Sequence, residues 1–242
     1  MATPAPSDKI WYLKRIKIFE DLDDTTLQAV ATKVVHSQFR RRATIFTAWD
    51  PGDRIYLLKS GRVKLYMLSE DGREVTLAIM EPGDIFGETA LVNPAARQAF
   101  AEALDDATVA VMGLADFKAL MRDQPDVALK VTQAIGQRLM QTQRQVESLA
   151  FADVSTRLAR FLLDQVTQRR DNANGHGPLR LPLALTHQEM ANLLGTTRET
   201  LTSTLNRLVD AGVLSVESRG TLLVLQPEEL RARAHVDAYA DD

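Results

Sequence analysis

Arg198 and Glu199 open a predicted helix, where two charged side chains can hydrogen-bond to a partner. Leu201, Leu205 and Leu208 recur at the spacing of one helical face, which predicts a buried stripe behind a polar surface. That polar surface comprises Arg198, Glu199, Thr202, Ser203 and Asn206. A helix-turn-helix protein needs this arrangement, because the N-terminal residues of its second helix meet base edges in the major groove of DNA.

A shorter helix is predicted immediately before it. Thr186 followed by Glu189 is a capping-box pattern, which fixes where this first helix begins. Gly195 supplies the permissive backbone that ends it, and Thr196 or Thr197 then caps the second helix. The sequence therefore predicts a helix-turn-helix within residues 186–201.

The segments around these two helices complete a predicted winged helix. The apolar runs 213–216 and 221–225 flank Ser218-Arg219-Gly220, and they indicate a hairpin that forms the wing. The other assignments are a cap and hinge at Asp153, a helix at 157–166, a loop at 171–178 and an acidic frayed helix or tail at 227–242.

The N-terminal half has a different pattern. Short β-type runs with glycine-containing turns occupy residues 37–112, which predicts a small β-sandwich or barrel. Asp71-Gly72 between two alternating runs is a strong hairpin signal. The runs are 55–58, 63–67, 75–79 and 108–111. Two helical patterns precede them within residues 10–36, with an apolar cluster of Trp11, Leu13, Ile16, Ile18 and Phe19 and a row of Leu27, Val30, Ala31 and Val34.

A long helix is predicted at residues 126–150, after a short one at 116–121 that ends before Pro125. Its apolar row has steps close to a heptad repeat, which favours a parallel two-stranded coiled coil. The row consists of Val131, Ile135, Leu139, Val146 and Leu149, with Thr142 in line. The alternative is a helix that packs on its own domain.

Composition excludes several classes of protein. The 242 residues suggest one or two domains, and no apolar run reaches the length of a membrane span. The absence of cysteine excludes disulfides, thiolate catalysis, Cys-ligated zinc and iron–sulfur clusters. The four histidines are scattered, and no nucleophile–base pair or phosphate loop with a lysine is present. We expect a cytoplasmic protein that is not an enzyme and has no metal, no haem and no membrane partner.

The chain has little net positive charge for a DNA-binding protein. Residues 1–152 carry 19 basic and 20 acidic side chains, residues 153–225 carry 8 and 7, and residues 226–242 carry 2 and 5, which sum to the net charge of −3. The predicted DNA-binding part is thus only slightly basic. Affinity for DNA must come from the local placement of arginines, from backbone N–H groups and from dimerisation.

Three features together resemble the cAMP receptor protein/fumarate–nitrate regulator family of bacterial transcription regulators, over about residues 10–225. They are the glycine-punctuated β-segment, the sequence Phe86-Gly87-Glu88-Thr89-Ala90-Leu91 followed by Arg97, and Arg198-Glu199-Thr200. The resemblance implies an α+β fold with a jelly-roll-like cyclic-nucleotide-binding β-roll, a long dimerisation helix and a C-terminal winged helix-turn-helix. The expected domains are an effector-sensing domain (1–125), a dimerisation helix with hinge (126–152) and a DNA-binding domain with an acidic tail (153–242).

In this family the Phe-Gly-Glu segment and the following arginine form the cyclic-nucleotide pocket. The resemblance implies that Glu88 accepts from a ribose 2′-OH and that Arg97 pairs with the cyclic phosphate. The full set of expected ligand-binding residues is Gly87, Glu88, Thr89, Arg97, Gln98, Arg138, Thr142 and Gln143.

Two positions depart from the family pattern. Gln98 replaces the usual Ser or Thr, and Gln143 stands where cAMP-responsive members often have Ser. The pocket is therefore expected to bind cAMP, to bind it weakly or to bind another ligand. The alternative is a ligand-independent protein in which Glu88 and Arg97 form an internal salt bridge.

The resemblance also assigns roles on the predicted second helix. Arg198 is expected to bind guanine O6/N7, and Glu199 to accept from cytosine N4. Ser203 stands where some members have a second arginine, which puts one guanine contact in doubt. Thr186, Gln188, Thr197 and Thr200 are candidate phosphate contacts or simply helix caps.

The expected protein is thus a homodimer through residues 126–150 that binds a palindromic promoter site on double-stranded DNA. Ligand would bias a hinge near 151–153 so that both second helices lie one helical turn of DNA apart. An activator would touch RNA polymerase with the loop 171–177. The alternative outside the class of DNA-binding proteins is a nucleotide-sensing regulatory module that acts through contacts with a partner protein.

Overall fold

The computed structural model describes residues 6–170, 179–183, 185–218 and 220–234. They divide into two compact units, Met1–Thr142 and Gln143–Asp242, and the division falls within the long helix α4 (Pro125–Phe151). The predicted loop 171–178, the wing residue Arg219 and the tail residues 235–242 lie outside the described residues.

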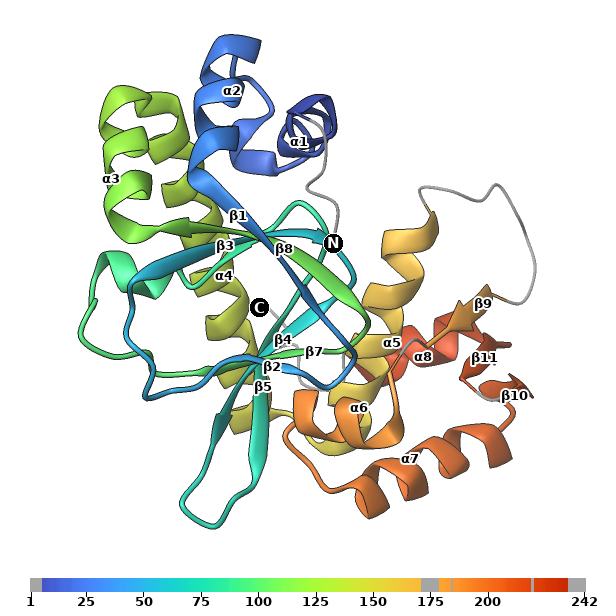
Figure 1. Cartoon of the computed structure of the whole chain (residues 1–242). Helices are drawn as coiled ribbons and strands as arrows, with labels where there is room; N and C mark the ends of the chain where they lie inside the picture. Colours follow the sequence, from blue (N-terminus) through green and yellow to red (C-terminus); the bar gives the residue numbers. More distant parts are fainter. Residues whose placement is uncertain (1–5, 171–178, 184, 219, 235–242) are drawn as a thin grey trace, which may run out of the picture. The chain divides into compact units, whose positions relative to one another are not determined.

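The N-terminal unit contains two four-stranded antiparallel sheets, with strand orders β1-β8-β3-β6 and β2-β7-β4-β5 (Figure 1). Between them lies a core that includes Phe46, Leu58, Val63 and Phe86. The four predicted β-type runs are confirmed within β3, β4, β5 and β8. The strands are β1 (Val34–Phe39), β2 (Thr44–Phe46), β3 (Arg54–Ser60), β4 (Val63–Leu68), β5 (Glu74–Met80), β6 (Ile85–Phe86), β7 (Phe100–Ala103) and β8 (Ala107–Gly113).

Helices gather at one end of the first sheet and build a second core with it (Figure 1). Two sequence predictions are wrong here. Trp11 is 62% exposed rather than part of the apolar cluster, and Val34 begins strand β1 rather than continuing a helix. The helices are α1 (Pro6–Leu13), η1 (Lys17–Phe19), α2 (Asp24–Lys33), η2 (Glu88–Leu91) and α3 (Leu114–Asp123), with the first turns of α4.

The apolar row of α4 has two parts with different environments. Val131 is 1% exposed and belongs to the core of its own unit, so its predicted place in an intermolecular seam is wrong. Farther along, Leu139 is 58% and Val146 61% exposed, with Ile135 also open to solvent. The alternative of a helix packed on its own domain therefore holds for the first turns of α4, and not for its exposed middle around Leu139.

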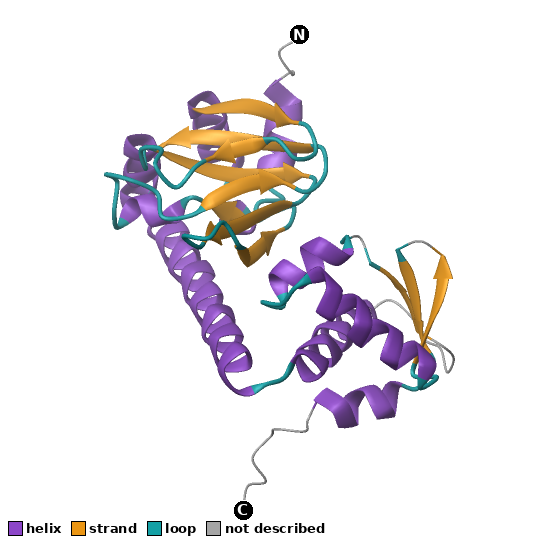
Figure 2. Ribbon diagram, turned by 90° about the horizontal axis from the view of Figure 1, so that it is seen from below, coloured by secondary structure: helices purple, strands orange, loops and turns teal. Residues whose placement is uncertain are grey.

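The C-terminal unit consists mainly of helices around one core, with a three-stranded sheet in the order β10-β11-β9 (Figure 2). The predicted wing hairpin is present, and β9 adds a strand that the sequence reading missed. The elements are α5 (Val154–Arg170), β9 (Leu179–Pro182), α6 (His187–Leu193), α7 (Arg198–Asp210), β10 (Leu214–Ser218), β11 (Thr221–Val224) and α8 (Pro227–Ala234).

Helix α8 corrects the prediction of a frayed helix or tail. Leu230 and Ala234 are buried in the core of the unit, and the Arg160 Nε donates to the Ala234 carbonyl at 2.9 Å. Residues 227–234 are therefore an integral part of the C-terminal unit.

The turn between α4 and α5 is held by hydrogen bonds in both directions. Asp153 caps α5, as predicted, because its Oδ1 accepts from the Thr156 N–H at 2.7 Å. This hydrogen bond holds the pKa of the Asp153 carboxyl below its ordinary value. The Arg157 Nη1 donates back to the Ala152 carbonyl at 2.7 Å. The predicted hinge is thus a well-bonded corner in this structure.

Candidate functional sites

Gly87 forms a tight turn between β6 and η2. Its φ of +79° lies in the left-handed region, where side chains are disfavoured. A Cβ at this position would lie 2.9 Å from the Arg97 Nη1 and 3.1 Å from the Tyr56 Cδ2. Glycine is therefore required both by the backbone conformation and by the close approach of Arg97.

Arg97 lies beside this turn and is 5% exposed. Its Nη2 donates to the Arg54 carbonyl at 2.8 Å, and its guanidinium stands 4.1 Å from the centre of the Phe46 ring. Tyr56 flanks it at 5.3 Å; burial raises the pKa of the Tyr56 phenol, and the charge of Arg97 acts in the opposite direction. The Arg97 Nε and Nη1 are buried without a hydrogen-bond partner in the described protein.

Glu88 presents the complementary group. It is 7% exposed, and its Oε1 accepts from the Arg138 Nη1 at 2.6 Å. Arg138 in turn donates through Nη2 to the Ile85 carbonyl at 2.8 Å. The Glu88 Oε2 is buried with no partner among the described residues. Glu88 therefore pairs with Arg138, and the internal salt bridge with Arg97 that the ligand-independent alternative expects is not formed.

An unsatisfied buried donor or acceptor costs about 1–3 kcal/mol, and more when it is charged. The free Nε and Nη1 nitrogens of Arg97 and the free Oε2 oxygen of Glu88 are thus suited to a ligand that carries both an anionic group and a hydroxyl. Cyclic nucleotides combine these two features, and the residues present fit such a ligand.

The remaining predicted pocket residues contribute less in this structure. Thr89, Gln98 and Gln143 are exposed, and none of their side chains makes a hydrogen bond within the described residues. Thr142 is half-buried, and its hydroxyl donates to the Arg138 carbonyl at 2.9 Å. The structure brings together Gly87, Glu88, Arg97 and Arg138. It adds the Phe46 and Tyr56 rings, which no local sequence signal connects to Arg97.

The helix-turn-helix is built by the predicted caps. Thr186 accepts from the Glu189 N–H and Glu189 from the Thr186 N–H, which completes the capping box of α6. Gly195 takes a φ of +58° after α6. Thr197, rather than Thr196, caps α7 by accepting from the Thr200 N–H at 3.2 Å.

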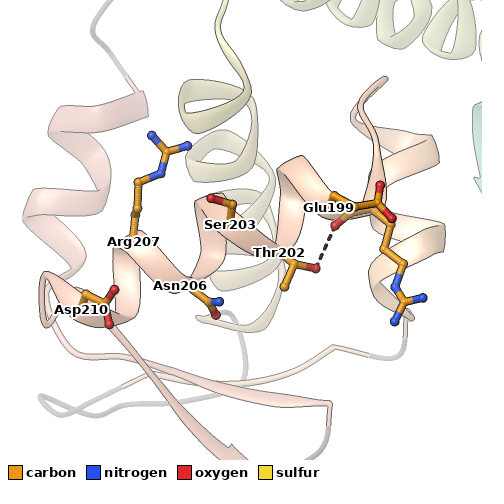
Figure 3. A pocket seen from close by; sticks show the side chains of 7 residues that line it. Glu199, Thr202, Ser203, Asn206, Arg207 and Asp210 are labelled. Atoms are coloured by element: carbon orange, nitrogen blue, oxygen red, sulfur yellow. Dashed lines mark hydrogen bonds between the residues drawn. The ribbon is translucent and has the colours of Figure 1, made fainter.

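Helix α7 buries Leu201, Leu205 and Leu208 and exposes a polar face, as predicted. We call this surface the polar face of α7; Figure 3 shows that its side chains follow the helix along its length, with Ser203 and Arg207 on one side and Thr202 and Asn206 on the other. Its members are Arg198, Glu199, Thr202, Ser203, Asn206, Arg207 and Asp210. The last two were not identified from the sequence, although Arg207 lies four residues after Ser203 and thus on the same side of a helix.

The threonine hydroxyls are largely engaged within the protein. The Thr202 hydroxyl donates to the Arg198 carbonyl at 2.8 Å, and its Oγ1 lies 3.1 Å from the His187 Nδ1. The hydroxyl oxygens of Thr186 and Thr197 serve as helix caps. Gln188 donates its side-chain amide to Asn192 at 2.8 Å and is exposed, as is Thr200.

The last turns of α4 contact the helix-turn-helix within the C-terminal unit. The Gln145 Nε2 donates to the Leu193 carbonyl at 3.3 Å. A Cβ on Gly195 would lie 2.4 Å from the Leu149 Cδ2, so the leucine packs directly on the glycine turn. Leu149, predicted for an intermolecular seam, therefore has a contact in its own chain.

No helix among the described residues is long and apolar enough to cross a membrane. No three His, Asp or Glu side chains in the described part of the chain gather as metal ligands would.

Two family models match the chain. A model described as a cyclic nucleotide-binding domain matches residues 36–124, and one described as a Crp-like helix-turn-helix domain matches residues 156–233. The first contains Gly87, Glu88 and Arg97, and the second contains the polar face of α7.

Characterised relatives cover most of the chain. A "CRP-like cAMP-activated global transcriptional regulator" of Mycobacterium tuberculosis is 32% identical over 92% of this chain and 98% of its own length. A "Cyclic AMP receptor protein" of Thermus thermophilus is 34% identical over 74% and 81%. A "Global nitrogen regulator" of Synechocystis is 31% identical over 75% and 80%.

Solved structures agree on the fold. A CooA mutant from Carboxydothermus hydrogenoformans has a TM-score of 0.73 and 29% identity, and covers 85% of this chain and 90% of its own. A CRP/FNR family regulator from Thermus thermophilus has a TM-score of 0.64 and 28% identity over 83% and 98%.

Proposed function

The chain belongs to the CRP/FNR family of transcription regulators, and from this premise we propose that it is a homodimeric DNA-binding protein controlled by cAMP. The observation that carries the proposal is the buried group of unsatisfied atoms formed by the Arg97 Nε and Nη1 and the Glu88 Oε2. The family combines a cyclic nucleotide-binding domain with a helix-turn-helix, so this site is where an effector would act on DNA binding.

The proposed binding mode uses these free groups. Arg97 donates to the cyclic phosphate through its planar guanidinium, and Glu88 accepts from the ribose 2′-OH. Gly87 lets the backbone approach the ligand, and Arg138 holds Glu88 in place. The resemblance adds Thr89, Gln98, Thr142 and Gln143 as further proposed contacts of the ligand. The M. tuberculosis relative is named as cAMP-activated, which supports cAMP as the effector.

The second candidate is a ligand-independent member of the same family. It is favoured by Gln98 and Gln143, whose exposed side chains differ from the short hydroxyl residues of cAMP-responsive members. It is opposed by the cost of the unsatisfied atoms, which a permanently empty site leaves uncompensated. Binding of DNA to the protein with and without cAMP separates the two.

On the DNA, we propose that Arg198 binds guanine and that Glu199 accepts from a cytosine amino group. Both side chains are exposed in the first turn of α7. The proposed phosphate contacts come from Gln188 and Thr200, with the caps Thr186 and Thr197, and Ser203 provides an uncharged contact. A bacterial transcription regulator must reach chromosomal DNA, which supports the cytoplasm as the location of this protein.

Arg198→Ala is expected to relax the preference for one G·C pair in each half-site, because a bidentate base contact is lost. The expected loss is about 1–3 kcal/mol of discrimination per contact. The measurement is the affinity for a site selected from random duplexes and for its variants, each with and without cAMP. Equal weakening on all sequences would contradict the base-specific role. A wild type that selects no sequence would instead favour a module acting through protein contacts.

The exposed row on α4 supports the proposed dimer. Ile135, Leu139 and Val146 offer apolar surface at seam spacing beyond the part of the helix that packs on its own unit. We place the dimer interface on residues 126–150 with Val131 outside it, and the hinge at 151–153. The domain boundaries expected from the sequence, and RNA polymerase as a partner of loop 171–177, remain part of this proposal.

Leu139→Asp is expected to convert the dimer to a monomer at micromolar concentration, because the charge would be buried at the centre of the seam. Sedimentation velocity measures the mass, and Lys118→Asp on the exposed side of α3 is the control for an added acid. A variant that sediments like the wild type would exclude this helix face as the interface.

A further inference from the structure

Arg207 is a cation on the polar face of α7 that the proposed base contacts do not use (Figure 3). Its side chain is exposed, and it forms no ion pair within the described residues. A mobile surface arginine would need no explanation, but the position and bonding of this one are specific.

Its guanidinium is anchored to the helix. The Arg207 Nη2 donates to the Thr204 Oγ1 at 3.1 Å, and the Thr204 hydroxyl donates to the Thr200 carbonyl at 2.9 Å. Thr204 is 1% exposed, so a buried hydroxyl holds the charged group at the surface. Preorganisation of this kind lowers the conformational entropy lost when the group binds a partner.

The distance along α7 determines what this group can reach. Arg207 lies nine residues after Arg198, which corresponds to about 13.5 Å along the helix axis and about two and a half turns, so it stands at the opposite margin of the polar face from Arg198. The major groove is about 12 Å wide, so a helix whose first turn meets the bases brings its third turn to the edge of the groove. At that edge the strand presents phosphates rather than base edges.

Charge makes such a contact necessary. Residues 153–225 carry only 8 basic and 7 acidic side chains, and Ser203 contributes no charge to the polar face. Asp210, three residues farther along α7, carries a negative charge that disfavours contact with a polyanion beyond this point. We propose that Arg207 is a second DNA contact, which binds a backbone phosphate at the edge of the major groove. This inference rests on the proposed DNA-binding function.

The test is the salt dependence of DNA binding for Arg207→Gln. Loss of one phosphate contact in each half of a dimer is expected to reduce the slope of log K against log salt by about 1.8. At 0.15 M salt, this change in slope corresponds to about 30-fold weaker binding. The loss is expected both on the selected site and on a shuffled duplex. Arg122→Gln, an exposed arginine on α3, makes the same charge change elsewhere and is expected to leave slope and affinity unchanged.

Thr204→Val provides a second measurement. It keeps the charge of Arg207 but removes its anchor, so we expect a several-fold loss of affinity with an unchanged salt slope. An Arg207→Gln protein that matches Arg122→Gln in both slope and affinity would overturn the inference while leaving the DNA-binding function intact. A loss confined to one base pair would also overturn it, because Arg207 would then contact a base. A wild type without sequence-specific binding would instead refute the proposed function itself.

Discussion

Replacing Arg97 with methionine is expected to remove at least about two thirds of the rise in melting temperature that the proposed binding of cAMP gives the wild-type protein. Truncating one partner of a buried, charged hydrogen bond costs about 2–5 kcal/mol, which is at least about 30-fold in affinity. For the wild type, ligand at 100 times its Kd contributes about 2.7 kcal/mol, or about 5–10 °C in a chain of this size. Differential scanning calorimetry with cAMP, and with cGMP in parallel, measures the difference.

The unliganded variant is expected to be nearly as stable as the wild type. Methionine removes the two unsatisfied buried nitrogens, Nε and Nη1, and this gain offsets the loss of the contact with Phe46 and of the hydrogen bond to the Arg54 carbonyl. Arg54→Gln is the matched control, since the Arg54 side chain is exposed and its carbonyl is retained. An Arg97→Met protein with an undiminished response to cAMP would refute the pocket. A wild type that binds specific DNA but responds to neither nucleotide would establish the ligand-independent alternative.

Gly61→Ala is expected to destabilise the N-terminal unit far more than Gly72→Ala. Both glycines have nearly the same left-handed φ, +78° and +77°. A Cβ on Gly61 would lie 2.5 Å from the Asp106 carbonyl oxygen and 2.8 Å from the Ala107 Cα, whereas nothing lies within 4 Å of one on Gly72. Backbone conformation alone costs about 1–2 kcal/mol, and the clash with backbone atoms adds about 1–3 kcal/mol.

The comparison of the two glycine variants isolates the effect of close packing, because the dihedral cost is common to both. Urea unfolding followed by circular dichroism gives the two free energies of unfolding. We expect Gly72→Ala to fold normally and Gly61→Ala to lose most of the cooperativity of the N-terminal unit. Equal losses would mean that strand β8 yields locally and that the close approach is not a constraint.

Features set by neighbouring residues could be predicted from the sequence. The capping box of Thr186 and Glu189 and the hairpin turn at Gly72 depend on residues only a few positions apart, and both are present. The fold class could also be predicted, because glycine-containing turns and alternating apolar residues determine where strands begin and end within short stretches of sequence. The site could be predicted only in outline: Glu88, Arg97 and Arg138 all come from the resemblance, and no pattern in the sequence pairs Glu88 with Arg138, fifty residues away.

Features set by tertiary packing could not be predicted. Val131 and Leu139 occupy the same apolar row at the same spacing, yet one is 1% and the other 58% exposed, because the N-terminal unit covers only the first turns of α4. Helix α8 has only two buried side chains, Leu230 and Ala234, amid charged residues, so its sequence resembles that of a solvated tail. Its order comes from the core that those two residues complete.

The contribution of α8 also has a consequence for biosynthesis. The helix-containing core of the N-terminal unit draws on residues up to Val131, whereas the core of the C-terminal unit needs residues from Leu158 to Ala234. Because a ribosome delivers the chain from its N-terminus, the nucleotide-binding unit has all its core residues long before the DNA-binding unit does. A nascent chain can therefore complete the core of its cyclic nucleotide-binding domain while the core of its helix-turn-helix domain still lacks α8. Premature termination before α8 would leave a chain with the first domain intact and the second without part of its core.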